Sequence, residues 1–113
     1  MPRPLVYGGV RAMWLLAMFD LPVLTKPERK AAAGFRKALV KDGFMMLQFS
    51  VYARPCPNEE NAKVHVARVR KAVPPAGEVR VLLLTDLQFG RMTVVSGGAA
   101  RKPEKTPPQL SLF

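Results

Sequence analysis

The chain has 113 residues, and its 18 Lys and Arg against 8 Asp and Glu give a net charge of +10 and an isoelectric point near 10.5. This length allows one domain, and the Pro-rich ends leave a packed part of about 85 residues, a size at which a partner subunit is expected. The charge favours nucleic acid over a membrane surface, and no segment is apolar for long enough to cross a bilayer.

One Cys and one His exclude an intramolecular disulfide and a zinc site built by a single chain. The first residues contain no run that is typical of a secretory signal. We therefore expect a cytosolic location.

The first predicted strand is the apolar run MWLLAMF, Met13 to Phe19, which follows a short tail over residues 1–12. Seven mostly large apolar residues indicate a strand that is buried on both faces. Pro22 cannot continue a hydrogen-bonded ladder, so Asp20 stands where this strand ends. The carboxyl ends of buried strands often hold ligands and metals, which makes Asp20 a candidate site residue. The alternative is that Asp20 only caps the turn into the next helix.

A helix is predicted to begin after Thr25 and to run to about Lys41. Thr25 and Glu28 match a capping box, and Pro27 sits in the first turn, where its missing N–H costs nothing. Asp42, followed by Gly, closes the helix. Apolar residues at spacings of three and four are expected to face the core: Ala32, Phe35 and Leu39.

The segment from Met45 to Pro55 is rich in β-branched and aromatic residues, which predicts one bent strand or two short ones. Gln48 and Ser50 lie among apolar neighbours there. Since buried polar groups need partners, these two are either satisfied across an interface or belong to a site.

Asn58 is expected to cap a second helix that runs to about Ala72. Its predicted apolar stripe is formed by Ala62, Val66, Val69 and Val73. His65 lies off that stripe beside Arg68, so we interpret it as a surface or phosphate-contacting residue rather than a catalytic base.

After a Pro-Pro-Ala-Gly turn, Glu78 to Thr85 reads as another buried strand. A tight DLQFG connection leads to a last strand, Arg91 to Ser96. The order strand, helix, strand pair, helix, strand, strand predicts an α+β fold over residues 13–97. It is a ferredoxin-like split βαβ sandwich with an antiparallel sheet and both helices on one face.

The blocks MWLLAMFDLP, KDGFMMLQFSVYARPC and NAKVHVARVRKAVPPAGEVRVLLLTDLQFGRM closely resemble the small CRISPR-associated Cas2 family, in the compact form that accompanies type II effector systems. The resemblance implies a homodimer in the spacer-acquisition complex, where it sits between two dimers of the CRISPR integrase subunit and holds double-stranded DNA. Asp20 matches the strand-end aspartate that is proposed to hold Mg²⁺ and to support a magnesium-dependent endonuclease. Many members have Tyr before this Asp, where Phe19 stands here.

One carboxylate per chain is too few for a tight Mg²⁺ cage. A two-fold axis between the first strands would let two copies of Asp20 share an ion with water and substrate phosphates. The other acids have structural interpretations: Glu28 as a cap partner, Asp42 as a helix end and Asp86 as a turn former.

The contrasting hypothesis is an architectural protein that performs no chemistry, because phosphate neutralisation by Lys and Arg binds DNA of any sequence. A third class is a metal-dependent endoribonuclease, toxin-like, that acts without an integrase partner. The expected phosphate contacts are Arg29, Arg36, Lys37 and Arg54, with a second group of Lys63, Arg68 and Arg70.

Residues 98–113 form a basic, Pro-rich tail of the kind that makes an extended tether. The tail ends in QLSLF, in which Gln109, Leu110, Leu112 and Phe113 resemble the short peptide that docks on the bacterial replication sliding clamp. Addition of an edge strand to the integrase subunit or to the partner protomer is the alternative for the same residues.

Overall fold

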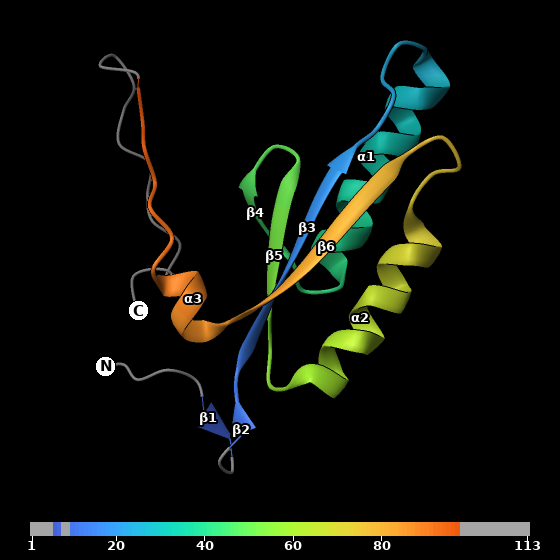
Figure 1. Ribbon diagram of the computed structural model, residues 1–113. Helices are drawn as coiled ribbons and strands as arrows, with labels where there is room; N and C mark the ends of the chain where they lie inside the picture. The colour runs from blue at the N-terminus through green and yellow to red at the C-terminus, as the bar shows by residue number, and fades with distance from the viewer. Residues whose placement is uncertain (1–5, 8–9, 98–113) are drawn as a thin grey trace.

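The computed structural model describes residues 6–7 and 10–97 (Figure 1). Its main sheet has the strand order β4-β5-β3-β6, with every neighbouring pair antiparallel. The strands are β3 (Met13–Asp20), β4 (Met45–Gln48), β5 (Val51–Cys56) and β6 (Glu78–Thr85). Helices α1 (Lys26–Lys41) and α2 (Glu59–Ala72) cover one face of this sheet. The predicted ferredoxin-like α+β fold is confirmed.

Strand β3 is buried on both faces, as its apolar run predicts. Leu15, Ala17 and Phe19 face the helices, while Trp14 and Leu16 belong to a second cluster on the other side of the sheet. All five are at most 7% exposed. Because β5 and β6 flank this strand, its backbone groups are paired on both sides as well.

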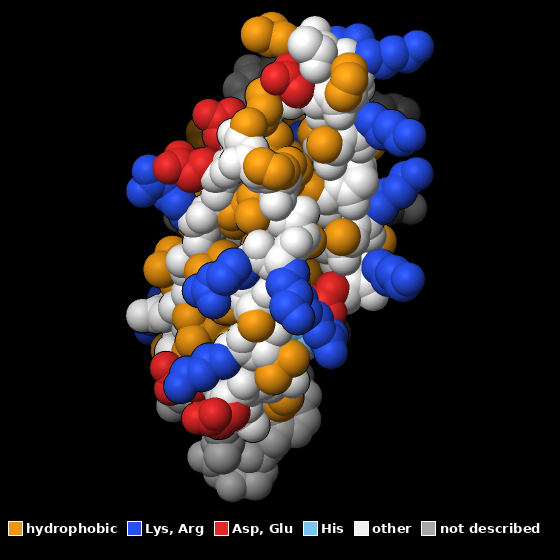
Figure 2. Space-filling view, turned by 90° about the vertical axis from the view of Figure 1, so that its right-hand side faces the viewer, with side chains coloured by type: hydrophobic (Ala, Val, Ile, Leu, Met, Phe, Trp, Pro, Cys, Tyr) orange, Lys and Arg blue, Asp and Glu red, His pale blue; other side chains and the backbone are white. Residues whose placement is uncertain are grey.

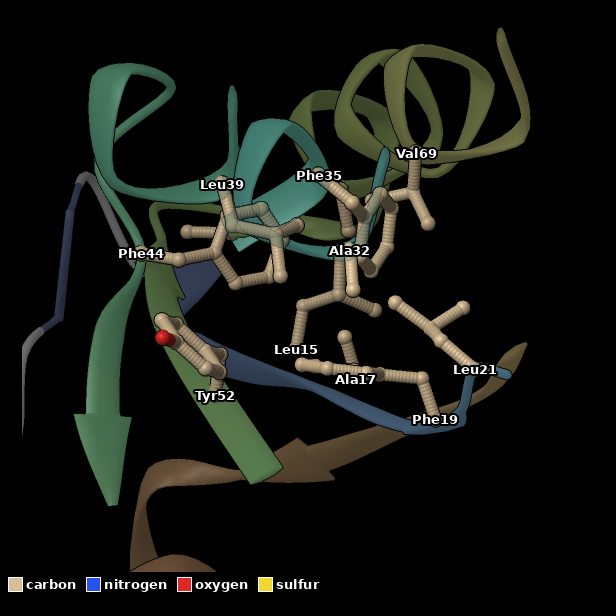
Figure 3. Packing of buried hydrophobic residues seen from close by; sticks show 12 residues of the cluster. Leu15, Ala17, Phe19, Leu21, Ala32, Phe35, Leu39, Phe44, Tyr52 and Val69 are labelled. Carbon is tan, nitrogen blue, oxygen red and sulfur yellow. The ribbon is translucent and has the colours of Figure 1, made fainter. Parts of the chain in front are cut away.

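Both helices begin at the predicted caps. The Thr25 hydroxyl accepts from the Glu28 N–H, and the Glu28 carboxylate accepts from the Thr25 N–H, so the capping box is complete. The Asn58 side chain accepts from the backbone N–H of Asn61. Figure 3 shows the core between sheet and helices, into which α1 sends Ala32, Phe35 and Leu39 and α2 sends Val69.

The segment after α1 is two strands rather than one. Gly43 has a φ of 94°, a left-handed conformation that suits Gly, and it turns the chain from α1 into β4. Strands β4 and β5 then form a hairpin with an irregularity between Met46 and Gln48. Gln48 is exposed, so it is not the buried polar group that the sequence indicates. Ser50 is partly buried, and its backbone carbonyl accepts a hydrogen bond from the Phe19 N–H at 3.0 Å.

Strand β6 lies at the edge of the sheet and is only partly buried, which corrects the expectation of a buried strand. Val81 is 38% exposed and Leu82 48%. The apolar composition of this strand does not reveal that only one neighbour, β3, pairs with it in the described chain.

The DLQFG segment forms a short helix, α3 (Asp86–Gly90), and Asp86 is a buried residue rather than a simple turn former. The Trp14 indole N–H donates to the Asp86 carboxylate at 2.9 Å, and the Phe89 ring stacks on the Trp14 ring with centroids 4.1 Å apart. These contacts fix α3 against the sheet face opposite to α1 and α2.

The predicted strand over Arg91 to Ser96 is wrong for the single protomer. These residues are exposed and have no strand assignment, and Val94 and Val95 are 80% and 86% exposed. A β-prone sequence becomes a strand only where another strand supplies hydrogen-bond partners, and α3 directs this segment away from the β6 edge (Figure 1).

Ahead of β3, a two-stranded sheet of β1 (Val6–Tyr7) and β2 (Val10–Arg11) lies within the segment that was expected to be a tail. In the described part of the chain, no helix is long and apolar enough to span a membrane. The QLSLF peptide lies outside the described residues.

Candidate functional site

Asp20 is the last residue of β3, and its side chain is exposed. Helix α1 begins at Lys26, and its N-cap is Thr25, so Asp20 is not the cap of that helix. Asp20 stands at the exposed end of an otherwise buried strand, which is the position that the sequence predicts for a site residue.

Glu78 is a second acidic residue at this end of the sheet, and the sequence analysis did not identify it as a candidate site residue. It lies directly opposite Asp20 in the antiparallel pairing of β3 and β6, and both residues are exposed. Side chains of directly opposite residues project from the same face of a sheet and lie near one another. Only the strand order brings Glu78 here, because 57 residues separate it from Asp20 in the chain.

The carboxylates of Asp20 and Glu78 are hard oxygen donors of the kind that Mg²⁺ prefers. Within the described part of one protomer, no group of three or more His, Cys, Asp or Glu could hold a metal ion. The donor set therefore fits Mg²⁺ only if water, substrate phosphate or a second protomer supplies the remaining ligands.

The loop between Asp20 and α1 is held by side chains of the first helical turn. The Glu28 carboxylate accepts from the Leu24 N–H at 2.9 Å, and Arg29 Nη1 donates to the carbonyls of Val23 and Leu24 at 3.2 and 3.0 Å. Arg29 is nevertheless an exposed residue. Its charge therefore lies close to the Asp20 end of the sheet.

Phe19, the residue directly before Asp20, is part of the hydrophobic core. Its ring is 7% exposed and packs edge-on against the Phe35 ring at 5.0 Å between centroids. It points toward the helices, whereas Asp20 is exposed. The aromatic side chain that precedes Asp20 contributes packing to the core here.

The predicted basic residues divide into two groups. Arg36 and Arg54 are half-buried and bonded to backbone carbonyls: Arg36 to Phe49, and Arg54 to Asp42 and Pro55. The exposed group is Arg29, Lys37, Lys63, Arg68 and Arg70. Lys63 makes only a long contact, 3.9 Å, with the exposed Glu60.

His65 is buried, which corrects the surface interpretation. It is 4% exposed, and its Nδ1 lies 2.8 Å from one oxygen of Asp42. Arg68 Nη1 donates to the other oxygen at 2.6 Å. Asp42 thus ends α1 as predicted, and it also ties that end to α2 through two side chains.

The environment of Asp42 favours its charged form. Partial burial acts to raise the pKa of this carboxyl, but hydrogen bonds and charge from His65 and Arg68 outweigh it and hold the pKa below its usual value of 3.8. A groove of about 320 Å³ lies beside this cluster, between the end of α1 and α2, and the apolar Leu39, Val69 and Ala72 contribute to its lining. The negative charge of Asp42 partly neutralises Lys41 and Arg68, which also line this groove.

Cys56 is buried in the core on the helix side of the sheet, and its burial raises the pKa of the thiol. A buried thiol that stays protonated is a poor nucleophile. Cys56 is therefore a core residue and not a candidate nucleophile.

The family model for the CRISPR-associated protein Cas2 matches residues 13–92, which is most of the folded part of the chain. The chain belongs to the Cas2 family. The match begins with the first residue of β3 and ends just after α3, so it includes both members of the Asp20 and Glu78 pair.

Two relatives support the same membership over nearly the whole chain. A protein from Parvibaculum lavamentivorans is 54% identical over 101 residues, which cover 89% of this chain and all of the relative. One from Flavobacterium psychrophilum is 47% identical over 103 residues, covering 91% and 90%. Both bear the name CRISPR-associated endoribonuclease Cas2.

The crystal structure of Streptococcus pyogenes Cas2 at pH 6.5 superposes with a TM-score of 0.57 at 21% identity, and covers 74% of this chain and 99% of that one. At this identity the likeness concerns the fold. The ferredoxin-like architecture of this Cas2 chain is therefore found in a solved structure as well.

We expect Asp42→Asn to lower the free energy of unfolding at pH 7 by about 1–2 kcal/mol, because His65 and Arg68 then lose a charged acceptor and Arg68 is partly screened by solvent. The folded-state pKa of Asp42 is lowered, so its contribution is complete above 3.8 and is lost as the pH falls through the lower folded value. The difference between wild type and variant should therefore shrink below pH 3.8.

Urea unfolding at pH 7 and at pH 3 measures this difference. Glu60→Gln is the control, since it removes only the exposed contact with Lys63 and should change stability by less than about 0.5 kcal/mol at either pH. An equal effect of Asp42→Asn at both pH values would contradict the assignment.

Proposed function

We propose that this Cas2 chain is a homodimeric scaffold for CRISPR spacer acquisition that binds duplex DNA without reading its sequence and bridges dimers of the integrase subunit. The observation that supports this most strongly is the charge of the helical layer. Helix α1 has six basic residues against one acidic, and α2 has four against two, so this layer carries +7 of the net +10. Figure 2 shows Lys and Arg side chains spread over this face, several of them along one edge.

A basic helical surface suits a protein that must accept DNA of any sequence. Lys and Arg that neutralise phosphates release counterions, which supplies affinity with no contact to base edges. The exposed Lys37, Lys63 and Arg70 are the strongest candidates, with Arg29 and Arg68 beside them. Arg36 and Arg54 also hold backbone carbonyls, so their replacement would affect folding as well as charge.

The homodimer is supported by apolar surface that one protomer leaves exposed. Strand β6 is an edge strand with Leu82 48% exposed, and Val94 and Val95 extend from α3 into solvent. An uncovered strand edge and a separate exposed, β-prone segment are both common places for association between copies of a chain. A two-fold axis near the end of β3 would also bring two copies of the Asp20 and Glu78 pair together.

We expect the triple variant Lys37→Gln, Lys63→Gln and Arg70→Gln to weaken duplex binding and to flatten its salt dependence. The slope of log K against log salt is negative, and each lost phosphate contact makes it less negative by about 0.9, so the loss of three contacts makes it less negative by about 2.7. Fluorescence anisotropy with a labelled duplex at several salt concentrations measures both effects.

The control is a second triple variant with the same change in net charge: Arg101→Gln, Lys102→Gln and Lys105→Gln, all in the C-terminal tail. If the two triple variants lose affinity equally, net charge and not the helical face governs binding. That result would contradict the proposed binding surface.

The second candidate function is a magnesium-dependent endoribonuclease centred on Asp20, and the name that the relatives bear favours it. Asp20 and Glu78 would hold Mg²⁺, which when bound stabilises charge on phosphate oxygens and lowers the pKa of bound water. The residues of this chain would contribute the carboxylates that fix the ion at the strand end, and Arg29 nearby would attract the phosphate backbone.

We expect Asp20→Asn to reduce magnesium-dependent cleavage of single-stranded RNA to the level seen with EDTA, and Glu78→Gln to reduce it partly. Both variants should keep the duplex binding of the wild type, because neither residue belongs to the basic helical surface. They should also keep the dimer mass, because each change removes a negative charge that would face its own copy across the proposed two-fold axis. Full cleavage by Asp20→Asn would exclude the Asp20 centre.

A spacer-integration assay with the integrase partner then separates the two functions. Intact integration by Asp20→Asn would mean that the scaffold works without the acidic site. If Asp20→Asn abolishes integration but keeps the dimer and duplex binding, Asp20 takes part in the acquisition mechanism.

The C-terminal peptide Gln109 to Phe113 is proposed to dock on a protein partner, either the integrase subunit, the partner protomer or the sliding clamp. Deletion of these five residues should leave the duplex affinity unchanged and weaken one of these associations. Pull-down with purified integrase and with purified clamp, together with the dimer mass, measures this. Unchanged association in all three cases would contradict the docking role.

A further inference from the structure

Phe49 is a large aromatic residue in the turn between β4 and β5, and 68% of it is exposed. The guanidinium carbon of Arg36 lies 3.7 Å from the centroid of its ring. A cation at this distance is attracted to the face of the ring. The aromatic side chain therefore has a charged partner on one face while most of its surface stays open to solvent.

Arg36 is itself held in place. Its Nε donates to the carbonyl of Phe49 at 3.3 Å, and its guanidinium carbon lies 5.4 Å from the ring of the buried Phe19. The guanidinium is thus fixed between the turn and the core. A ring whose orientation is already restricted loses less conformational entropy when a ligand contacts it, so Phe49 is pre-organised for binding.

Phe49 lies at the same end of the sheet as Asp20. The Phe19 N–H donates to the Ser50 carbonyl at 3.0 Å, which continues the pairing of β3 with β5 beyond Met18 and Val51. The β4–β5 turn that carries Phe49 therefore lies beside the last residues of β3. The Phe49 ring lies on the helix side, next to Arg36 of α1, whereas Asp20 follows the helix-facing Phe19 and projects from the opposite face of the strand end.

We propose that Phe49, backed by Arg36, is a stacking platform for an unpaired nucleobase of a nucleic-acid strand whose backbone passes the Asp20 end of the sheet. Every base has a π-face, so stacking on an aromatic ring is tolerant of sequence, and nearby cations attract the phosphates. Bases inside a duplex are already stacked, so the ligand is a single strand or an opened duplex end. This inference rests on the proposed nucleic-acid binding, and it adds the residue that would hold a base of the strand.

Two variants of Phe49 distinguish base stacking on the aromatic ring from nonspecific hydrophobic contact. Phe49→Leu keeps an aliphatic side chain over Arg36 but removes the aromatic face, and Phe49→Trp keeps an aromatic face. Leu24→Ala is the matched control, because Leu24 is an 86% exposed apolar residue in the loop that follows β3 and has no aromatic ring.

The experiment uses the full-length protein with two probes of about 12 nucleotides, a single strand that contains the fluorescent base 2-aminopurine and a blunt duplex. Wild type should quench 2-aminopurine on binding, because stacking quenches its emission. Phe49→Leu should lose the quenching and bind the single strand about 5- to 150-fold more weakly. Phe49→Trp and Leu24→Ala should stay within about twofold of wild type, and duplex affinity should be unchanged in all variants.

Single-strand affinity and quenching that survive Phe49→Leu would overturn the stacking platform. Equal losses on single strand and duplex, or an altered dimer mass, would overturn it too, since Phe49 would then act in folding or in a protein contact. A wild-type protein that binds the single strand with quenching but fails to bind duplex would contradict the proposed scaffold function and leave the platform standing.

Discussion

The rest of the structure depends on the burial of β3 on both faces. One side of this strand packs against α1 and α2, and the other packs against Phe89 of α3. Because β5 and β6 pair with it on both edges, neither its side chains nor its backbone can shift without opening a core. The packing and pairing of β3 therefore fix the position of its last residue, Asp20, although the Asp20 side chain is exposed.

The strong positive charge of the chain serves two purposes that only the structure separates. Arg54 and Arg36 close turns by donating to backbone carbonyls, and Arg68 shares Asp42 with the buried His65. These contacts tie α1 to α2 and to the β4–β5 hairpin of the sheet. The remaining Lys and Arg of the helices project into solvent, where they form the surface that we propose for DNA.

Duplex binding and cleavage, as proposed for this Cas2 protein, are compatible because they use different parts of the molecule. Duplex binding uses the helical face, whereas the proposed dimer axis lies near the acidic pair at the end of β3. The acidic pair and the aromatic turn lie toward the same end of the sheet, where the proposed single strand would pass. Loss of the acidic chemistry would leave the helical surface intact.

The sequence by itself determined β3, α1, α2 and β6 and the points where the two helices begin, because these depend on local signals. The apolar run before Asp20, the capping box of Thr25 and Glu28, and the spacing of Ala32, Phe35 and Leu39 were each sufficient, and the family resemblance agreed with them. Only the tertiary structure decided what depends on contacts between distant residues. The strand order placed Glu78 opposite Asp20, left β6 half exposed, and left Arg91 to Ser96 without a partner strand. It also buried His65 and Asp86, whose partners lie 23 and 72 residues away in the chain. Helical and strand periodicity report which face of an element is apolar, whereas a polar residue is buried or exposed according to the partner that the fold brings to it.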